Sequence, residues 1–428
     1  MRGVRDARSV ALDVLVRVED GAFAHVLLPA RLRGSGLDAR DRAFVTHLVF
    51  GTVRMQRRLD ALIGPRCHQP LDRLEPRVRA ALRLGAFQLL DGVAPHAAVG
   101  ATVEAAPPRA RGLVNAVLRA VAAAGPEALD PADLGARWSY PDWIVDELTR
   151  SLPEPEVAAV LEAGNEPAAV TLRPNPRVTT TADLGAELTA AGARVTPAAL
   201  VPEALVVAAI GDPAVLPAVA EGRATPQDQA SQAVVAALDP QPGGRILDVA
   251  AAPGGKATGA AERAPGGTVV AADVHAGRLR LVAAAAARLG LTEVVPVLAD
   301  GRRPPVRPGS CDRVLVDAPC SGLGVLRRRA EARWRARPEA VPVLAALQRD
   351  LLGAAAGAVA PGGLLVYSVC TLTRAETVEV AAWATANLDG FTPVAPPGDP
   401  WRPLGPGAVL WPHLAGTDGM FVCVLRRR

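Results

Sequence analysis

The stretch ILDVAAAPGGKATG, residues 246–259, joins a short apolar strand to the start of a helix through a loop of small residues. In an open parallel sheet, ligands bind at the carboxyl ends of the strands, where small residues let the backbone come close to them. The sequence matches neither of two common nucleotide-binding motifs. The phosphate-binding loop GxxxxGK[ST] would need Gly at Ala250 and Ser or Thr at Ala257, and the dinucleotide-binding motif GxGxxG does not occur. The stretch therefore predicts a nucleotide-like cofactor, and it disfavours an NTPase or a dinucleotide enzyme.

Strands and helices alternate through the rest of the carboxyl half. This alternation predicts a mostly parallel, doubly wound α/β sheet. The last ten residues, GMFVCVLRRR, predict a further strand that could close the sheet as an antiparallel edge. The expected strands are residues 245–250, 268–272, 294–298, 313–317 and 363–369, and the expected helices are residues 256–263, 276–289, 339–359 and 374–387.

Upstream, residues 7–124 carry apolar side chains at helical spacing, interrupted by Gly and Pro where loops between helices belong. This predicts an all-α bundle of five to seven helices. Residues 1–130 hold 19 basic and 13 acidic groups, an excess of six positive charges, whereas the whole chain has a net charge of +4. A basic module suits a phosphate-backbone partner, although an excess of this size is also common on ordinary solvated surface.

Between these parts, residues 125–155 contain five prolines and predict a linker, and short runs up to residue 222 predict a small α+β subdomain. The expected domains are residues 1–130, 131–222 and 223–428. The five cysteines form no CxxC pair, which argues against a disulfide framework or a structural zinc site. With no secretory leader and no long apolar run, we expect free thiols, no metal and a cytoplasmic protein.

Acidic residues end three successive predicted strands, namely Asp248, Asp273 and Asp300. Their carboxylates would face one crevice, where Asp273 is placed to accept hydrogen bonds from ribose hydroxyls. Each alone could instead be a helix cap. Lys256, within the glycine loop, is the only lysine in the chain, which suggests that this position needs a compact ammonium group. The alternative is that one lysine was retained by chance in a sequence that otherwise uses arginine.

Two cysteines, Cys320 and Cys370, follow the fourth and fifth predicted strands, in VLVDAPCSGLG and LLVYSVC. A buried cysteine is commonly an inert small apolar residue. Their matched placement beside Asp317 predicts instead that both open onto one pocket as reactive groups.

These motifs resemble a known family. LDVAAAPGGKAT, DAPCSGLG and YSVCT are similar to three signature motifs of the RNA cytosine-5 methyltransferases that use S-adenosylmethionine, and TPQDQAS at residues 225–231 is similar to their entry motif. RDRAFVTHLVFGTVR, LRLGAFQLL and GLVNAVLRA resemble the NusB-type RNA-binding domain of the bacterial Sun type (RsmB), which acts on small-subunit (16S) ribosomal RNA. The resemblance implies a NusB-like helical domain, then a small α+β RNA-binding subdomain and a Rossmann-like class I methyltransferase domain with a seven-stranded sheet.

The resemblance also implies roles for individual residues. Cys370 matches the nucleophile that adds to carbon 6 of cytosine, Asp317 matches the residue at the nitrogen 3 edge, and Cys320 matches the residue that releases the product. Ala250 departs from the family's usual Cys, which affects none of this chemistry. The expected partner is ribosomal RNA, with no membrane, and the expected state is a monomer. The residues expected to bind S-adenosylmethionine are Ala252, Pro253, Gly254, Gly255, Lys256, Asp273, Arg278, Asp300 and Asp317.

A basic segment follows the DAPCSGLGVL stretch, with an aromatic residue inside it. Such a segment beside a catalytic loop suits the phosphates that flank an unpaired or swung-out base, and the alternative is a solvated helix face. The expected RNA-binding residues are Arg327, Arg328, Arg329, Arg333, Trp334 and Arg335, with Arg337 just beyond.

Two other functions compete. A methyltransferase acting on an exocyclic nitrogen would show Asn or Asp, then Pro-Pro and an aromatic residue, where this chain has DAPC. A binding module or antitermination factor that acts through the NusB-like part would need no cysteines at strand ends. Which cytosine is modified, and whether naked RNA or a particle is the substrate, stay open.

Overall fold

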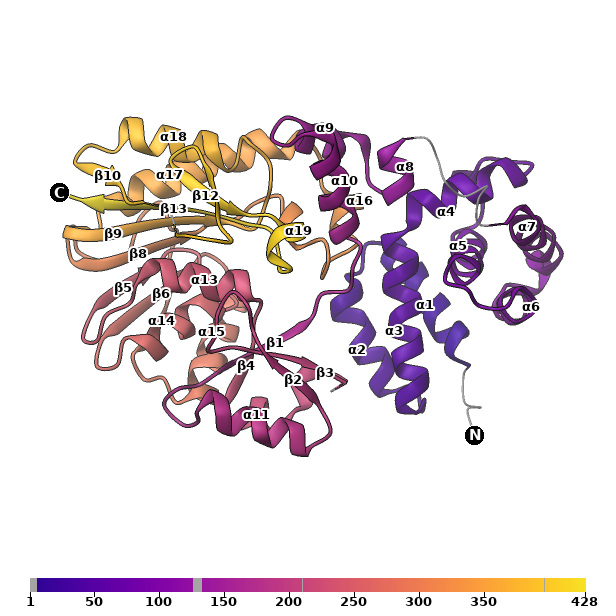
Figure 1. Cartoon of the computed structure of the whole chain (residues 1–428), viewed down its shortest axis with the longest axis horizontal. Coiled ribbons are helices and arrows are strands. Elements are labelled where there is room, and N and C mark those ends of the chain that lie inside the picture. Colours follow the sequence, from indigo (N-terminus) through magenta and orange to yellow (C-terminus); the bar gives the residue numbers. More distant parts are fainter. Residues whose placement is uncertain (1–5, 126–132, 210, 396) are drawn as a thin grey trace. The chain divides into compact units, whose positions relative to one another are not determined.

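The computed structural model describes residues 6–125, 133–209, 211–395 and 397–428. These fall into two compact units. The first comprises residues 1–165 together with 326–335, and the second comprises residues 166–325 and 336–428 (Figure 1). The chain thus leaves the second unit for ten residues directly after the loop that carries Cys320, and then returns to it.

The first unit is helical. Asp6 caps its first helix by accepting hydrogen bonds from the backbone N–H groups of Arg8 and Ser9. One core of buried leucines and valines, Leu12, Leu48 and Leu82 among them, joins the helices, and the predicted bundle is confirmed. Its helices over residues 7–124 are α1 (Ala7–Glu19), α2 (Ala24–Arg33), α3 (Ala39–Arg54), α4 (Gln56–Ile63), α5 (Pro76–Leu90), α6 (Pro95–Ala105) and α7 (Arg111–Ala124).

The expected linker over residues 125–155 is wrong where the structure describes it. Three further helices follow α7 within the helical unit: α8 (Leu134–Trp138), α9 (Asp142–Thr149) and α10 (Glu154–Ala163). Pro141 and Pro153 stand at the N-caps of α9 and α10, and Pro155 lies in the first turn of α10. Proline is compatible with a helix at these positions because the first N–H groups have no partner within the helix.

The second unit opens with a small antiparallel sheet of strand order β2-β3-β1-β4, whose apolar face packs on Leu184 and Leu188 of a helix. This agrees with the expected α+β character. From β1, the buried Arg173 reaches the helix after the glycine loop, where it pairs with Glu262 at 2.8 Å and donates to the Gly255 carbonyl at 2.7 Å. The elements are β1 (Val170–Pro174), α11 (Thr181–Ala190), β2 (Arg194–Pro197), β3 (Leu205–Ala208), α12 (Pro217–Ala220) and β4 (Ala224–Pro226).

The main sheet has a parallel half, in the order β9-β8-β5-β6-β7, as the alternating pattern predicts. Figure 1 shows α17 and α18 over one face and α13, α14 and α15 over the other. The elements are α13 (Gln229–Leu238), β5 (Arg245–Asp248), α14 (Gly255–Arg263), β6 (Thr268–Asp273), α15 (Ala276–Leu289), β7 (Val294–Leu298), β8 (Cys311–Asp317), α17 (Ala340–Ala356), β9 (Val359–Val369) and α18 (Val378–Asn387).

The carboxyl end of the chain extends this sheet with antiparallel strands. The predicted last strand, β13 (Met420–Arg427), pairs with β9 on one side. It is not an edge, because β12 (Gly407–Leu410) and β10 (Phe391–Pro393) pair with the two ends of its other side, and β11 (Arg402–Leu404) pairs with β12. Within the described residues the sheet therefore has nine strands, two more than the expected seven. In the same residues no helix has the length and apolar character needed to cross a bilayer.

Candidate active site

The glycine loop lies at the carboxyl end of β5, as predicted. Gly254 has φ +106°, and a Cβ there would lie 3.0 Å from the Val282 Cα on α15, so only glycine fits. The loop is held by two expected cofactor residues: Asp273 accepts from the Ala252 N–H at 3.2 Å, and the Arg278 guanidinium donates to the Ala252 carbonyl at 2.8 Å. Asp273 and Arg278 thus hold the backbone of the loop in place.

Lys256 and Asp317 form an ion pair at the centre of the site. The Lys256 Nζ lies 2.6 Å from one Asp317 oxygen, and the Ser368 hydroxyl donates to the other at 2.8 Å. Burial acts to lower the pKa of Lys256, but the charge and hydrogen bond of Asp317, together with the charges of Cys370 and Asp248, outweigh burial and keep this pKa above its ordinary value. The ammonium group is therefore charged, and it ties the cofactor loop to the end of β8.

Asp248 lies beside this pair and is only 1% exposed. Burial, and then the negative charge of Asp317, raise the pKa of Asp248 to about 7. Its Oδ2 atom has no hydrogen-bond partner among the described residues. A buried oxygen without a partner has the capacity to bond a ligand group or a water molecule.

Cys320 and Cys370 lie together, with their sulfur atoms 3.4 Å apart. The hydrogen bond from the Cys320 thiol lowers the pKa of Cys370, with help from the positive charge of Lys256. The same hydrogen bond, burial and the negative charge on Cys370 raise the pKa of Cys320 well above its ordinary value. Of the two, Cys370 therefore loses its proton more readily and Cys320 keeps its proton more readily, which is the order that a nucleophile and a proton carrier need.

Gly324 and Gly419 fix the two cysteine loops against each other. The Gly324 N–H donates to the Cys370 carbonyl at 2.9 Å, and the Gly419 N–H donates to the Gly324 carbonyl at 2.8 Å. A Cβ on Gly324 would lie 2.0 Å from the Gly419 oxygen. Gly419 lies far from the cysteine motifs in the sequence, so its part here was not predicted.

Asp300 is the predicted acid that the structure does not bring to this cluster. It follows β7 and pairs with Arg302 at 2.7 Å, and the hydrogen bond from that side chain lowers the pKa of Asp300 to about 2. No described contact joins it to the cysteines or to Asp317. Its role toward the cofactor stays a prediction.

Part of the basic segment after Cys320 is buried in the helical unit. The prediction that Arg333 contacts RNA is wrong, because its side chain is fully buried in the helical unit and donates to the Asn165 side chain at 2.8 Å and to the Gly164 carbonyl at 3.1 Å. Its guanidinium also lies 4.0 Å from the centroid of the Tyr140 ring. The wide separation of these partners in the sequence explains why composition alone suggested a solvent-facing arginine.

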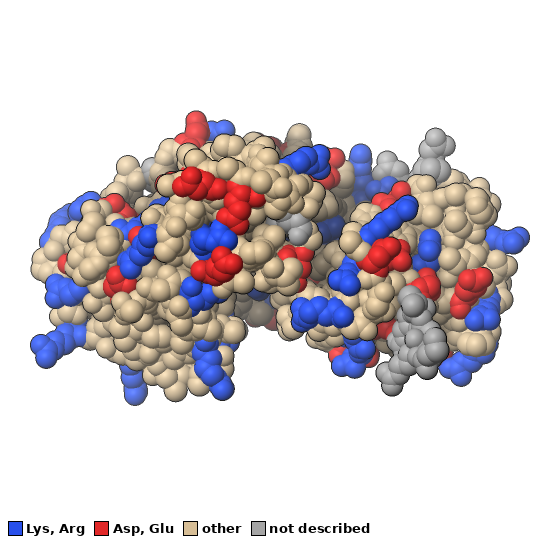
Figure 2. Space-filling view, turned by 90° about the horizontal axis from the view of Figure 1, so that it is seen from below, with Lys and Arg blue, Asp and Glu red and all other residues tan. Residues whose placement is uncertain are grey.

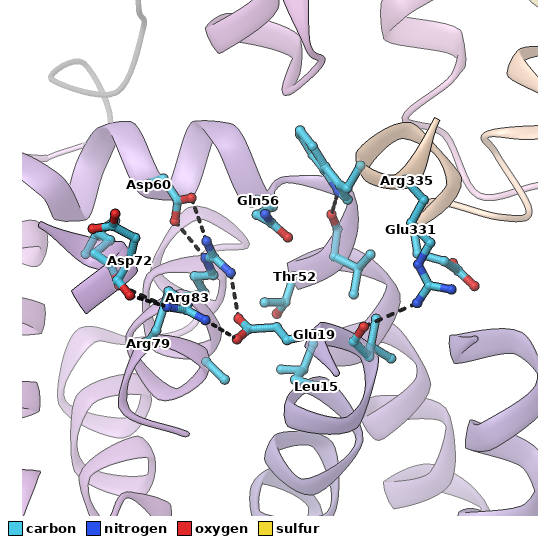
Figure 3. Close-up of a pocket in the computed structure, with 15 residues that line it drawn as sticks. Leu15, Glu19, Thr52, Gln56, Asp60, Asp72, Arg79, Arg83, Glu331 and Arg335 are labelled. Carbon is cyan, nitrogen blue, oxygen red and sulfur yellow. Dashed lines mark hydrogen bonds and ion pairs between the residues drawn. The ribbon is translucent and has the colours of Figure 1, made fainter. Parts of the chain in front are cut away.

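Its neighbours in α16 (Ala332–Arg335) are also occupied. The Trp334 indole donates to the Val53 carbonyl at 2.7 Å, and Arg335 donates to the Val18 carbonyl at 3.2 Å while lying over the Phe23 ring. Figure 3 shows Arg335 beside a pocket of the helical unit, and Trp334 also lines this pocket. Arg329 and Arg337 are exposed, and Arg327 and Arg328 are half-buried. An RNA contact therefore stays a prediction for the residues around Arg329.

The pocket in Figure 3 shows that some arginines of the helical unit form ion pairs within it. In this cavity of about 750 Å³, Glu19 pairs with both Arg79 and Arg83, and Arg83 also pairs with Asp60 at 2.7 Å. These arginines are engaged within the protein. On the face drawn in Figure 2, basic and acidic side chains are interspersed over both units.

The donor set at the strand ends fits S-adenosylmethionine. Asp273 accepts one backbone N–H on each carboxylate oxygen, from Ala252 and His275, and so keeps acceptor capacity for hydroxyl groups. Asp248 keeps a buried oxygen available for a hydrogen bond with the ligand, and the small-residue loop leaves room for it. Among the described residues, no group of three acidic, His or Cys side chains could hold a metal ion. Fold and site together define a methyltransferase that depends on S-adenosylmethionine.

Comparisons with known proteins give the family. The model described as 16S rRNA methyltransferase RsmB/F matches residues 235–426, the NusB family model matches residues 5–123, and a ferredoxin-like domain model of RsmF/B-like methyltransferases matches residues 140–212. The putative methyltransferase Rv1407 of Mycobacterium tuberculosis is 39% identical over 100% of this chain and 97% of its own. Ribosomal RNA small subunit methyltransferase B of Vibrio cholerae is 34% identical over 99% and 98%. The chain belongs to the RsmB/F family of methyltransferases.

Solved structures share this fold. The crystal structure of PH0851 matches with a TM-score of 0.83 at 24% identity and covers 99% of each chain. A methyltransferase homolog protein from Pyrococcus horikoshii matches with a TM-score of 0.60 at 26% identity, over 69% of this chain and 98% of its own. The expected order of a NusB-like helical part before a methyltransferase part is thus confirmed.

Proposed function

We propose that this protein methylates carbon 5 of a cytosine in small-subunit ribosomal RNA, in the cytoplasm, through a covalent bond between Cys370 and carbon 6. The observation that carries the proposal is the cysteine pair, with sulfur atoms 3.4 Å apart beside Asp317. A methyltransferase acting on an exocyclic nitrogen needs no such pair. The name of the Vibrio cholerae relative, ribosomal RNA small subunit methyltransferase B, supports the choice of RNA.

The first step uses Cys370. Carbon 5 of cytosine is a weak nucleophile, and addition of a thiolate at carbon 6 turns the ring into an enamine that is nucleophilic at carbon 5. The lowered pKa of Cys370 favours the thiolate, because the Cys320 thiol donates to it and Lys256 lies nearby. S-adenosylmethionine, when bound, supplies an electrophilic methyl group.

Asp317 and Lys256 act on the edge of the base. As negative charge develops on the ring toward nitrogen 3, a fixed positive charge nearby stabilises it. The Lys256 ammonium supplies that charge, and the Asp317 carboxylate, 2.6 Å from it, can accept a hydrogen bond from the exocyclic amino group. Ser368 holds the carboxylate in place at 2.8 Å.

The last step uses Cys320. The hydrogen bond to Cys370 and the charge of Cys370 are two causes of its raised pKa. Both disappear once the Cys370 sulfur is bonded to carbon 6, so Cys320 then loses its proton to water more easily. As a thiolate, it takes the proton from carbon 5; the electron pair of that bond restores the double bond between carbons 5 and 6 and expels Cys370 as a thiolate.

Small-subunit ribosomal RNA labelled with tritium at carbon 5 of its cytosines tests the reaction. Methylation at carbon 5 must release one tritium to water for each methyl group transferred, whereas methylation of the exocyclic nitrogen retains all of it. We expect a ratio of one. Methyl transfer without tritium release would rule out the proposal.

A further inference from the structure

Glu376 is a buried carboxylate close to the cysteine pair that the reaction above does not use. Its side chain is inaccessible to solvent and accepts four hydrogen bonds. One oxygen accepts from the Ser321 N–H at 2.9 Å and from the Gln348 amide at 3.1 Å. The other accepts from the Ser321 hydroxyl and from the Thr373 hydroxyl, the latter at 2.8 Å.

These partners belong to both cysteine loops. Ser321 directly follows Cys320, and Thr373 is three residues after Cys370. The Ser321 hydroxyl also lies 2.6 Å from the Thr371 hydroxyl, which directly follows Cys370. The Glu376 carboxylate thus joins the loop of Cys320 to the loop of Cys370, and both cysteines must reach the same cytosine.

The residue before Cys320 is held as well. The Gln348 amide, which donates to Glu376, also donates to the Pro319 carbonyl at 2.9 Å. The Tyr367 hydroxyl in turn donates to the Gln348 side chain at 2.9 Å. Cys320 is therefore fixed on both sides by groups that converge on Glu376.

Burial of the Glu376 carboxylate restricts the positions of its four hydrogen-bond donors. A buried charge is tolerated only where hydrogen bonds compensate it, so the four donors must keep their positions for the fold to be stable. The Cys320 sulfur can then shift little relative to the Cys370 sulfur. An error of about 1 Å in such a position can cost about 100-fold in rate.

We propose that Glu376 is a positioning residue for the release step, setting Cys320 where it can take the proton from carbon 5. This inference rests on the proposed function. Three of the four hydrogen bonds to Glu376 come from Ser321 and Gln348, which hold the Cys320 loop, and only one comes from Thr373 in the Cys370 loop, so loss of Glu376 affects release more than addition. A variant at Glu376 should therefore accumulate covalent protein–RNA complex even though both cysteines are present.

The test compares Glu376→Ala, Glu376→Gln, Cys320→Ala and the wild type after incubation with small-subunit ribosomal RNA and S-adenosylmethionine. Glutamine keeps an oxygen for the Ser321 N–H and places an amide where the two hydroxyls can accept, so it should restore turnover. Tyr367→Phe is the matched control, since its hydroxyl contacts the Gln348 side chain and the Glu376 carbonyl but makes no hydrogen bond to Ser321, Thr371 or Thr373.

We expect Glu376→Ala to leave a covalent band on a denaturing gel, as Cys320→Ala does, with turnover reduced by about 100-fold. Glu376→Gln and Tyr367→Phe should leave little or none. S-adenosylmethionine affinity, measured by calorimetry, should stay within about twofold in all variants, because Glu376 contacts no residue of the glycine loop. Should Glu376→Ala fail to fold, Ser321→Ala removes the hydroxyl contacts with Glu376 and Thr371, keeps the backbone N–H, and should leave a weaker band.

If Cys320→Ala traps RNA but folded Glu376→Ala and Ser321→Ala do not, the positioning role is wrong. If Cys320→Ala itself traps nothing while the wild type methylates RNA, then the proposed function fails instead. The two failures are thus separate results of one gel.

Discussion

The only lysine of the chain, Lys256, lies 2.6 Å from Asp317, so the first turn of α14 is joined to the end of β8 by an ion pair. Lys256 belongs to the glycine loop of the cofactor site, and Asp317 belongs to the motif that ends in Cys320. The pair also places a positive charge where it lowers the pKa of Cys370. Cofactor loop and nucleophile are therefore electrostatically linked.

Replacing Lys256 with Met should make Cys370 less reactive. Methionine keeps an unbranched apolar stem but removes the charge, so the pKa of Cys370 should rise and its alkylation should require higher pH. The measurement is the rate of iodoacetamide labelling at Cys370 against pH, read by mass spectrometry. Arg302→Met removes a positive charge that is paired with Asp300 instead and serves as the control. An unchanged pH profile in Lys256→Met would show that the ammonium does not act on this thiol.

Asp248 should make stability depend on pH. Its folded pKa of about 7 lies above its ordinary value, so the folded state holds a proton that the unfolded state loses, and stability falls as pH rises from about 4 to about 7. Asp248→Asn removes the titrating group. Its stability relative to the wild type should therefore increase over that range, by up to about 4 kcal/mol. Calorimetric melting of both proteins at pH 5 and pH 8 measures this, and an equal difference at the two pH values would contradict it.

Arg333 and Arg329 should behave in opposite ways although both lie in the basic segment. Arg333→Ala removes hydrogen bonds and a ring contact from the interior of the helical unit, so it should cost roughly 3 kcal/mol of stability. Arg329→Ala changes an exposed side chain and should leave the Tm unchanged.

If Arg329 contacts a phosphate, its loss should reduce the slope of RNA affinity against salt by about one. Filter binding between low and moderate salt gives that slope. A large loss of stability in Arg329→Ala, or none in Arg333→Ala, would contradict the burial described above.

Gly324→Ala should abolish methyl transfer while sparing the cofactor site. The added Cβ would lie 2.0 Å from the Gly419 oxygen, so the loops of Cys320 and Cys370 must separate. Gly353→Ala on α17 is the matched control, because its Cβ would meet nothing closer than 3.8 Å. Methyl transfer to RNA and calorimetric binding of S-adenosylmethionine provide the two readouts. An active Gly324→Ala would show that the loops tolerate displacement.

Much of the fold was predictable because local pattern and tertiary structure agree. The predicted bounds of α15 and β7 are those observed. The apolar residues of α15 recur at helical spacing and those of β7 form a short continuous run, so each pattern indicates the element that forms. The cysteine pair could be inferred because both motifs end parallel strands that are neighbours, β8 and β9.

The errors arose where distant contacts decide the outcome. The segment around Arg333 has the composition of a solvated basic helix, and only its contacts with Tyr140 and Asn165 bury it. Glu376 carries no local signal, because its partners Ser321 and Gln348 come from other parts of the chain. The prolines before residue 156 suggested a linker, whereas several of them start helices.

The most direct test of the covalent mechanism is a denaturing gel of Cys320→Ala, Cys370→Ala and wild type after incubation with unmodified small-subunit ribosomal RNA and S-adenosylmethionine. We predict a covalent protein–RNA band in Cys320→Ala alone, because that variant forms the bond at carbon 6 and cannot break it. Absence of a band in every variant, while the wild type still transfers methyl groups to the RNA, would contradict the roles given to both cysteines.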